Sequence, residues 1–402
     1  MNPLISVLLP TKNRLTYLRY AVESVRRQDY PHWEIVISDN HSEEDILGYA
    51  QSLHDPRISC LRTERPLHVT ANWNNALDHC RGDFVIMLGD DDGLTRGYFS
   101  AMVALLDRHQ QPDLIFTNAY VYAYPGVIPG RRHGFLKSDG SPIFRHPEPY
   151  LLRPDVAHGL AKQSMHFTMA YPFNMQYSFV ARSLIDELKH RGAFYQSPYP
   201  DYYCTNALFL SAKRILVDPA PRVIIGVSPK SYGFYHFNNK EDEGASFLDN
   251  APEQVDIERL RRILLPGTKG ASAWLLAMEH LQISFPELHL AVDYQRYRQL
   301  QIGNLFKRYY LTGDISSDDF NELLVRLTWK ERWLAGLPLM AALRLTRLFD
   351  PAWRSRILNL VRRLAGHDHA GRLETHDSDD DATTYTNLLE VFEHEGVGHQ
   401  TQ

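Results

Sequence analysis

Three consecutive aspartates, Asp90, Asp91 and Asp92, follow directly after the apolar run at residues 84–88 and the turn residue Gly89. Adjacent carboxylates repel one another unless a cation or solvent compensates their charge. Hard divalent cations such as Mn²⁺ or Mg²⁺ bind carboxylate oxygens and leave coordination positions for phosphate oxygens. The triplet therefore predicts a metal site that would hold a diphosphate and neutralise the charge on a leaving group. The alternative is a solvated acidic turn that caps the following helix.

A second polar cluster follows the first apolar run of the chain. Residues 5–9 form a short β-rich run that ends at Pro10, and Thr11, Asn13 and Arg14 come next. Hydroxyl, amide and guanidinium groups at the end of a strand can bind the polar edges of a ligand. Taken alone, the segment is equally well a plain loop that begins a helix.

A single carboxylate ends the second apolar run. Asp39 follows residues 33–38, which read WEIVIS. A carboxylate at the end of a strand can accept hydrogen bonds from a nucleobase or a ribose. The alternative is a helix cap or turn residue, because the following Asn40, His41 and Ser42 are also typical of a cap.

The elements that carry these residues alternate in type through about residue 120. Further strands and helices are predicted by apolar spacing at residues 15–28, 43–53, 57–61, 69–79, 98–108 and 114–117. Strands that alternate with helices of this length indicate a mostly parallel sheet with helices on both faces. Ligands of such sheets lie beyond the carboxyl ends of the strands. The three polar clusters should therefore meet along one edge of the sheet.

The second half of the chain does not continue the regular alternation of strands and helices. Residues 124–146 are rich in Pro, Gly, Arg and Ser and predict a long loop or lid. The later predicted elements are a strand leading into a helix at 178–188, a helix at 202–212, strands at 214–217 and 222–227, and helices from about 250 onward.

The composition is that of a globular protein with two or three domains. The 402 residues are 44% hydrophobic and 23% charged, and the net charge of -5 gives no sign of a nucleic-acid partner. The 3 cysteines have no CxxC spacing, which argues against a disulfide framework or a cysteine zinc site. No apolar run of about 18 residues and no signal-peptide pattern is present. A cytoplasmic location is therefore expected.

Three segments, ISVLLPTKNR, WEIVISDN and ANWNNALDHCRGDFVIMLGDDD, resemble the N-terminal half of family-2 glycosyltransferases when taken in this order and spacing. The resemblance covers residues 4–120 well and continues more thinly to about 235. It implies the GT-A fold, a Rossmann-like α/β architecture that binds nucleotide sugars, and transfer that inverts the anomeric centre. The donor would be a nucleotide sugar, with a UDP-sugar favoured, and the acceptor a saccharide or a lipid-linked saccharide in bacterial surface polysaccharide synthesis.

The resemblance also implies roles on the donor side. Thr11 and Asn13, with Pro10 and Arg14 in the same loop, match the segment that contacts the nucleobase and ribose. Asp39 matches the aspartate that binds the base. Asn72 and Trp73 stand where many relatives carry an arginine, so an Asn-Trp-Asn segment replaces a charged donor contact.

The acidic triplet matches the region of the family's Asp-x-Asp signature. Gly89 takes the place of the usual first aspartate, so Asp91 is the expected metal ligand. Asp90 then suits the ribose, and Asp92 is a second candidate for the metal or the donor sugar. His236 is a further candidate ligand for the metal or diphosphate, and its alternative is an ordinary histidine among aromatic residues.

The catalytic base is expected in the second half of the domain. An inverting transfer needs a carboxylate that deprotonates the acceptor hydroxyl. The segment GAFYQSPYPDYYCTNALFL has the family's layout, with Asp201 at the start of a helix. The usual Glu-Asp pair is Pro200-Asp201 here, so the base position is kept. The alternative is that Asp201 is only a helix N-cap.

The expected domains are a nucleotide-sugar-binding catalytic domain at 1–240, a helical C-terminal domain at 250–365 and an acidic, mobile tail at 366–402 with one short helix at 385–393. Between residues 326 and 363, basic residues interleave with Leu, Trp and Phe. Such helices can lie on an anionic membrane surface, which would put the protein at the inner face of the membrane. The alternative is a helical bundle that packs on the catalytic domain or on a partner.

Two other functions remain open. A nucleotidyltransferase on a related fold would normally carry a glycine-rich phosphate loop after the first strand, and PTKNR has no glycine. A non-catalytic scaffold or membrane-surface binding protein would not need both the acidic triplet and Asp201.

Overall fold

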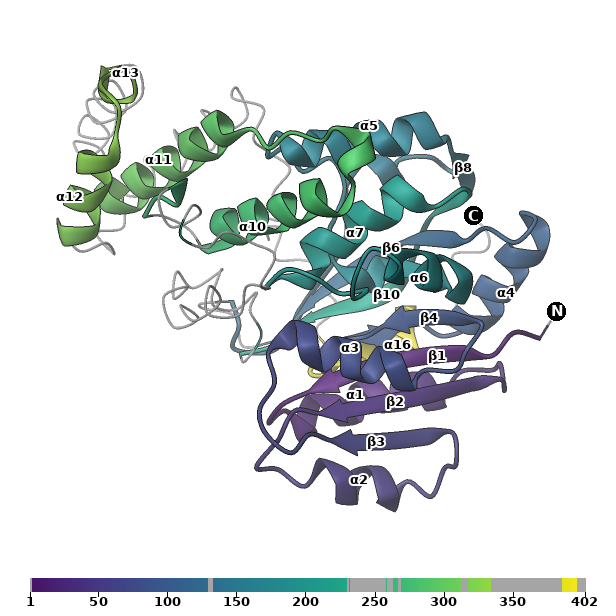
Figure 1. Cartoon of the computed structure of the whole chain (residues 1–402). Coiled ribbons are helices and arrows are strands. Elements are labelled where there is room, and N and C mark those ends of the chain that lie inside the picture. The colour runs from purple at the N-terminus through teal and green to yellow at the C-terminus, as the bar shows by residue number, and fades with distance from the viewer. Residues whose placement is uncertain are drawn as a thin grey trace. The chain divides into compact units, whose positions relative to one another are not determined.

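The structure is a computed structural model that describes residues 2–128, 133–229, 231, 258, 263–266, 269–311, 317–333 and 385–395. The chain divides into two compact units (Figure 1). The first comprises residues 1–161, 171–240 and 377–402, and the second comprises residues 162–170 and 241–376. All the predicted site residues that the structure describes lie in the first unit.

A 10-stranded sheet forms the centre of the first unit, with the spatial order β3-β2-β1-β4-β9-β6-β10-β5, β7 beside β6 and β8 beside β10. The strands are β1 (Ile5–Thr11), β2 (Trp33–Asp39), β3 (Ile58–Arg62), β4 (Phe84–Met87), β5 (Gly93–Leu94), β6 (Leu114–Ala123), β7 (Phe135–Ser138), β8 (Tyr150–Leu152), β9 (Ser178–Ala181) and β10 (Ile215–Val227). β1, β2, β3, β4, β6 and β10 run in one direction, and β9 enters antiparallel between β4 and β6. This confirms the expected mostly parallel α/β sheet.

Burial explains why the central strands form where they do. Every residue of β1, β2 and β4 is buried. Strands covered on both faces read as nearly continuous apolar runs, which is the pattern these segments show. Their carboxyl ends therefore emerge from a rigid core, and the polar residues that follow are held in place by it.

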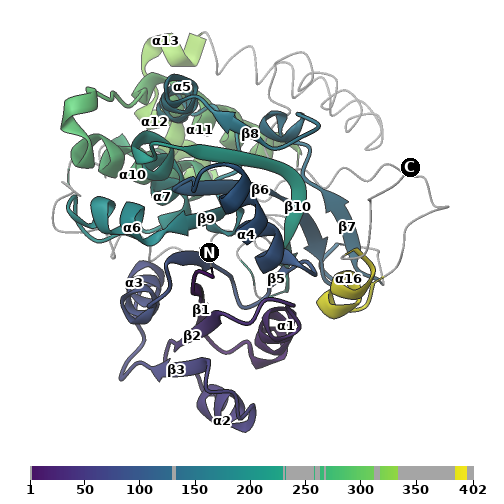
Figure 2. The ribbon, with the colours of Figure 1, turned by 90° about the vertical axis from the view of Figure 1, so that its right-hand side faces the viewer.

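Helices cover both faces of this sheet. Figure 2 shows α1 and α3 on opposite sides of β1 and β2. The helices of the first unit are α1 (Leu15–Arg26), α2 (Ile46–Ser52), α3 (Val69–His79), α4 (Tyr98–Arg108), α5 (Pro154–Met165, which ends in the second unit), α6 (Arg182–Lys189), α7 (Pro200–Ser211) and α16 (Leu388–Glu395), with short 3-10 turns η1 (Pro142–Phe144) and η2 (Met175–Tyr177).

Two segments differ from the sequence-based expectation. The stretch expected to be a loop or lid at 124–146 contains β7, which pairs antiparallel with β6. The two strands expected at 214–217 and 222–227 are one strand, β10, whose pairing with β6 shifts register between Asp218 and Val223. Pro219 and Pro221 lack the N–H that a regular ladder needs, and an irregularity at this point accommodates them.

The second unit is helical in its described part, with α10 (Lys269–Ser284), α11 (Tyr294–Leu311), α12 (Ser317–Arg326), α13 (Trp329–Glu331) and the turn η4 (Pro286–Leu288). Its core includes Phe167, whose ring lies 5.5 Å from Trp274 and 5.7 Å from Tyr297. None of the helices in the described residues is both long enough and apolar enough to cross a membrane. Most of the basic stretch at 326–363 lies outside the described residues.

Candidate active site

The ends of β1 and β2 bring the first two polar clusters together. Thr11 and Asp39 are register partners in the parallel pair, and the Asn40 N–H donates to the Thr11 carbonyl at 2.9 Å. The pairing of Leu8 with Met87 places the end of β4 beside the same edge. The acidic triplet and the two polar clusters therefore meet at the carboxyl ends of three neighbouring parallel strands, as the sequence predicted.

Asp90 is bound to the loop that follows β1. The Thr11 hydroxyl donates to Asp90 Oδ2 at 2.8 Å, and Arg14 Nη1 donates to Asp90 Oδ1 at 2.9 Å. Burial lowers the pKa of Arg14, but the facing carboxylates raise it by more, so the guanidinium stays charged. Arg14 is therefore a fixed cation at the edge of the acidic turn.

Asp91 has one occupied and one open carboxylate oxygen. The Ser228 hydroxyl donates to Asp91 Oδ2 at 2.6 Å, and the Tyr124 hydroxyl donates to the Asp91 backbone carbonyl at 3.1 Å. Asp91 Oδ1 lies 3.7 Å from Arg14 Nη1 and accepts no hydrogen bond from the described residues. Burial raises the Asp91 pKa to about 6, despite the opposing effect of Arg14. A cation beside Oδ1 would relieve this cost.

The Asp92 carboxylate accepts three hydrogen bonds from the protein. Its Oδ2 accepts from the Gly89 N–H at 2.8 Å and from Gln176 Nε2 at 2.6 Å, and its Oδ1 accepts from the Gly226 N–H at 2.8 Å. Burial first, and then the neighbouring Asp91, raise the Asp92 pKa to about 8. Because both oxygens are occupied, Asp92 ties the acidic turn to η2 and β10.

Gly226 is required for this arrangement. A Cβ at this position would lie 1.7 Å from the Asp91 carbonyl oxygen. Only glycine lets β10 approach the acidic turn closely enough for its N–H to reach Asp92.

The carboxylates fit a divalent cation only with help from other ligands. Among the described residues no group of three His, Cys, Asp or Glu side chains is arranged around a common metal position. Within the described residues, Asp91 Oδ1 is the oxygen of the triplet that accepts no hydrogen bond. A Mn²⁺ or Mg²⁺ ion there would take its remaining ligands from donor phosphates and water, as Mg²⁺ sites commonly do. His236, the other predicted ligand, lies outside the described residues.

Asp39 is fully buried at the end of β2. Its Oδ1 accepts from the Ser42 N–H at 2.9 Å, and its Oδ2 lies 3.4 Å from Arg62 Nη1. Arg62 also donates to the Ser42 carbonyl at 2.8 Å. The carboxylate is therefore fixed at the edge of the site, next to an arginine at the end of β3.

Three other predicted donor residues make contacts within the protein. Asn13 adopts a left-handed backbone with φ of 55°, and its Oδ1 accepts from the Glu43 N–H at 2.7 Å. Asn72 Oδ1 accepts from the Ser38 hydroxyl at 2.7 Å, directly before Asp39. The half-buried Trp73 packs edge-on against Tyr195 with ring centroids 5.2 Å apart. Asn13 and Asn72 thus support the loop and strand that carry Thr11 and Asp39.

Asp201 lies in the first turn of α7, one residue after Pro200. The N-cap residue of α7 is Tyr199, so Asp201 is not the N-cap, and its Oδ1 accepts from the Met175 N–H at 2.8 Å. Burial of the carboxyl group raises the Asp201 pKa to about 7. A half-buried carboxylate with a pKa near neutrality is poised to accept a proton at physiological pH.

The turn η2 connects the two carboxylate groups of the site. Met175 binds Asp201 and the next residue, Gln176, binds Asp92. Consecutive residues lie about 3.8 Å apart at their Cα atoms, so Asp201 and Asp92 contact the same short segment of the chain. The structure therefore assembles Thr11, Asp39, the triplet and Asp201 in one region.

Sequence patterns did not indicate Gln176, Ser228, Tyr124 or Arg62. Three of them stand at strand ends: Arg62 is the last residue of β3, Tyr124 directly follows β6 and Ser228 directly follows β10. Those positions were the available signal, and Gln176 had none.

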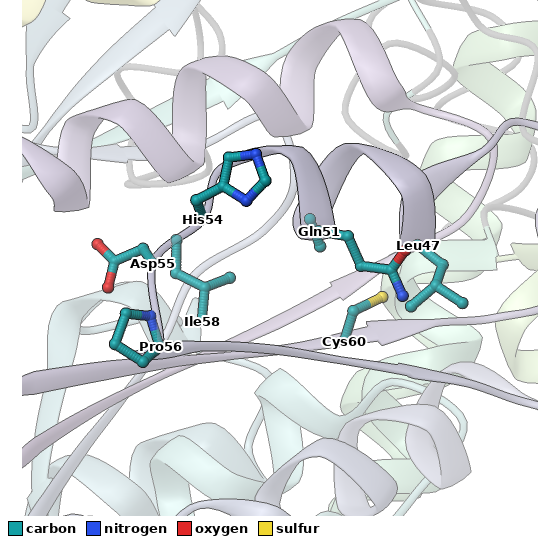
Figure 3. Close-up of a pocket in the computed structure, with 8 residues that line it drawn as sticks. Leu47, Gln51, His54, Asp55, Pro56, Ile58 and Cys60 are labelled. Carbon is teal, nitrogen blue, oxygen red and sulfur yellow. The ribbon is translucent and has the colours of Figure 1, made fainter.

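An open groove of about 500 Å³ lies elsewhere, between α2 and the start of β3 (Figure 3). Leu47, His54, Ile58 and Cys60 are among the residues that line it. β2 and β1 separate β3 from β4 in the sheet, and none of the predicted site residues lines the groove. We therefore exclude it from the candidate active site.

Comparison with known proteins finds a family that the N-terminal part of the chain resembles. Residues 6–168 match the sequence model described as "Glycosyl transferase family 2". The chain is 26% identical over 276 residues to "Putative colanic acid biosynthesis glycosyl transferase WcaA" of Escherichia coli (strain K12), an alignment that covers 65% of this chain and 88% of that protein.

Two further similarities are more limited. Over 104 residues the chain is 38% identical to "GalNAc(5)-diNAcBac-PP-undecaprenol beta-1,3-glucosyltransferase" of Campylobacter jejuni, covering 25% of this chain and 34% of that protein. S. aureus TarS 1-349 in complex with UDP-GlcNAc has a TM-score of 0.47 and 14% identity, covering 86% of this chain and 91% of that one. This structural likeness is too low to carry a functional argument.

Proposed function

We propose that this chain, which belongs to glycosyl transferase family 2, is an inverting glycosyltransferase that moves a sugar from a nucleotide-sugar donor to an acceptor hydroxyl. The observation that carries the proposal is the pair of contacts made by η2. One of its residues holds Asp201 and the next holds the acidic turn. A proton acceptor and a site for a diphosphate therefore lie together, which is the arrangement that inverting transfer requires.

On the donor side, the ends of β1, β2 and β4 bind the nucleotide. Asp39 accepts hydrogen bonds from the base, and Arg62 beside it fixes the direction of its carboxylate. Asp90, held by Thr11, binds the ribose. Asp91 Oδ1 would hold Mn²⁺ or Mg²⁺, and that ion would neutralise charge on the leaving nucleoside diphosphate.

On the acceptor side, Asp201 is the general base. Its carboxylate removes the proton of the acceptor hydroxyl as that oxygen forms a bond to the anomeric carbon. The bond between the anomeric carbon and the diphosphate oxygen breaks on the opposite face, and the electron pair leaves with the diphosphate. Attack opposite the leaving group inverts the anomeric centre, and Asp201 holds the proton afterwards.

Asp92 takes a positioning role in this proposal. Sequence comparison made it a second candidate for the metal or donor sugar, but its two oxygens accept three hydrogen bonds from the protein. A metal at Asp92 would have to displace at least one of these buried donors and leave it unsatisfied, which costs about 1–3 kcal/mol. Asp91, with one open oxygen, needs no such displacement.

The acceptor is proposed to be a saccharide, carried on a lipid diphosphate at the membrane surface. The Campylobacter relative is named for a PP-undecaprenol substrate. In the second unit, Trp329 and Trp333 are 70% and 67% exposed, close to the basic Lys330 and Arg332. Exposed tryptophans next to basic residues suit the interface of an anionic membrane.

The proposal is tested by the thermal stability of the full chain with a panel of nucleoside diphosphates and nucleotide sugars, each with and without Mn²⁺ or Mg²⁺. A ligand at 100 times its Kd stabilises the native state by about 2.7 kcal/mol. We expect a UDP compound to raise the melting temperature in a metal-dependent way.

The Asp91→Asn variant should lose this metal-dependent shift. Asp155→Asn, at an exposed carboxylate on α5, should retain it. Absence of a shift with every nucleotide would contradict the proposal and favour a non-catalytic scaffold. Formation of a nucleotidyl product in place of a glycoside would favour the nucleotidyltransferase alternative.

A further inference from the structure

The helix α16, near the C-terminal end of the chain, packs in the first unit against α1 and β5 (Figure 2). Its inner face and the Tyr385 side chain that precedes it are buried, because Leu388, Val391, Phe392 and Tyr385 are at most 3% exposed. Composition alone placed these residues in a mobile acidic tail with one short helix. The short helix is present, and it belongs to the core that surrounds the acidic turn.

The first link to the site is a contact between Leu388 and Gly93, the residue that directly follows Asp92. A Cβ at Gly93 would lie 2.4 Å from Leu388 Cδ2, and its three nearest atoms all belong to the Leu388 side chain. Leu388 therefore fills the space that a side chain at position 93 would need. Because Gly93 also pairs with Ile224 of β10, the residue directly after the acidic turn lies between Leu388 and the sheet.

The second link passes through two tyrosines of β6 and the segment after it. The Tyr385 carbonyl accepts from the Gly134 N–H at 2.9 Å and from the Tyr122 hydroxyl at 3.3 Å. The Tyr122 ring lies 4.8 Å from the ring of Tyr124. Tyr124 in turn donates to the Asp91 carbonyl at 3.1 Å. Contacts thus run without a gap from Tyr385, three residues before α16, to the backbone of the expected metal ligand.

A third set of contacts fixes the helix in its register. Glu393 pairs with Arg27, at the end of α1, at 2.8 Å and also pairs with Arg96, two residues beyond β5. The Arg96 guanidinium also lies 5.6 Å from the Phe392 ring centroid. Exposed ion pairs contribute little stability on their own, but one carboxylate shared by two arginines from separate elements allows a single docked position.

From these contacts we infer that residues 385–395 are a brace that positions the acidic turn at residues 89–92 for donor binding. The brace touches neither donor nor acceptor. It acts through Gly93 on one side and through Tyr122 and Tyr124 on the other. The expected effect of the brace on activity rests on the proposed function. Its expected effect on the position of the acidic turn rests on the contacts alone.

The test makes the side chain at position 388 smaller and the side chain at position 93 larger, singly and together, in the full chain. Leu388→Ala removes the atoms that hold the turn, and Gly93→Ala pushes the brace away. In the double variant the new methyl group at 93 occupies space that Leu388 has vacated. We expect each single variant to lower kcat/KM for the nucleotide-sugar donor about 10-fold, since small misplacements in active sites have effects of this order or larger. The double variant should recover to within about 3-fold of the wild type.

Hydrogen exchange provides a readout that needs no activity. Leu388→Ala should speed exchange at the amides of residues 89–93 as well as in α16, and the double variant should slow both again. Leu275→Ala makes a comparable cavity in α10 of the second unit, where Leu275 is also fully buried, and should leave residues 89–93 unchanged. Should Leu388→Ala fail to fold, Tyr122→Phe removes one hydrogen bond to the brace and should raise exchange at residues 385–388 and 91.

Two results would overturn the inference. One is faster exchange in α16 of Leu388→Ala with unchanged exchange at residues 89–93. The other is a double variant no closer to the wild type than either single variant. If the wild type transfers no sugar from any donor, the proposed function fails, while the exchange data still decide whether the brace holds the turn.

Discussion

At the scale of single residues, Asp201 combines a contact to Met175 with a carboxyl group whose burial raises its pKa to about 7. A general base works only in its ionised form. We therefore expect kcat/KM to rise with pH below about 7 and to level off above it. A pH profile of initial rates with saturating metal measures this, and a profile that is flat between about pH 5 and 8 would contradict the role of Asp201.

Replacement of the same residue gives a second prediction about activity. Asp201→Asn keeps an acceptor for the Met175 N–H but cannot take a proton, so kcat should fall by about 10²–10⁴-fold with donor binding nearly unchanged. Asp139→Asn is a matched control, because Asp139 also binds η2, through the Tyr177 hydroxyl at 2.7 Å. Equal losses of donor binding and turnover in Asp201→Asn would indicate a structural role instead.

The raised pKa of Asp201 also has a consequence for stability. The carboxyl has a reference pKa of 3.8 and a folded-state pKa of about 7, so the folded state holds the proton more tightly. Its contribution to stability is present in full below pH 3.8 and is lost as pH rises through about 7. Asn cannot ionise, so Asp201→Asn should be about as stable as the wild type near pH 4 and more stable near pH 8, by about 2 kcal/mol after discounting for partial exposure.

Thermal denaturation of the two proteins across this pH range measures the difference. A difference in stability between the two proteins that does not change with pH would contradict the raised pKa of Asp201.

The sequence indicated the residues of the site that end strands or begin helices. Asp39 and Asp91 follow apolar runs, and Asp201 begins a helical pattern, so their local context is informative. Gln176 and Ser228 reach the triplet from 84 and 137 residues away in the chain. Contacts of that separation depend on how the strands pair, which a single sequence does not reveal.

At the scale of elements, β10 depends on Gly226 to lie against the acidic turn. A Cβ there would meet the Asp91 carbonyl oxygen at 1.7 Å and the Tyr124 ring at 3.1 Å. Because a backbone atom cannot move cheaply, Gly226→Ala should destabilise the protein by about 1–3 kcal/mol and displace Asp91 and Asp92. Thermal denaturation and donor-binding measurements test this.

Gly159→Ala in α5 is the matched control. A Cβ at Gly159 would have nothing within 4 Å, and Ala favours a helix by about 1 kcal/mol over Gly. This variant should therefore gain stability and keep its affinity for the donor. If Gly226→Ala behaved in the same way, β10 would not restrain the acidic turn.

Elements were predictable where burial left a strong pattern. β1, β2, β4 and β6 read as apolar runs because both faces of the sheet are covered. β7 was missed because its four residues are only partly buried or exposed and depend on pairing with β6. β10 was read as two strands because its register shift falls at the prolines in the middle.

At the scale of the whole molecule, the described parts form two units, and residues 377–402 group with the first. The short helix expected at 385–393 is present as α16, but an 8-residue helix in an acidic stretch does not indicate where it packs. Its apolar face packs against α1 and β5, which lie hundreds of residues earlier in the chain. Stability of the catalytic unit thus depends on a segment that the sequence indicated to be a tail.

The second unit carries the last prediction, which concerns the membrane. Val325, Trp329 and Trp333 are 78%, 70% and 67% exposed on α12 and the turn that follows. Lys330 and Arg332 stand among them and are exposed as well. Such a surface should enter the headgroup region of an anionic bilayer through its indole rings and bind phosphates through its basic side chains.

We expect the full chain to co-sediment with vesicles rich in phosphatidylglycerol and not with pure phosphatidylcholine. Binding should weaken with salt because it depends on charge. The double variant Trp329→Ser with Trp333→Ser should bind about 10-fold less, a loss of about 1.4 kcal/mol. Leu151→Ser with Val156→Ser, at two apolar residues of the first unit that are 47% and 42% exposed, should bind like the wild type. Equal binding by both double variants would mean that the tryptophans do not contact lipid.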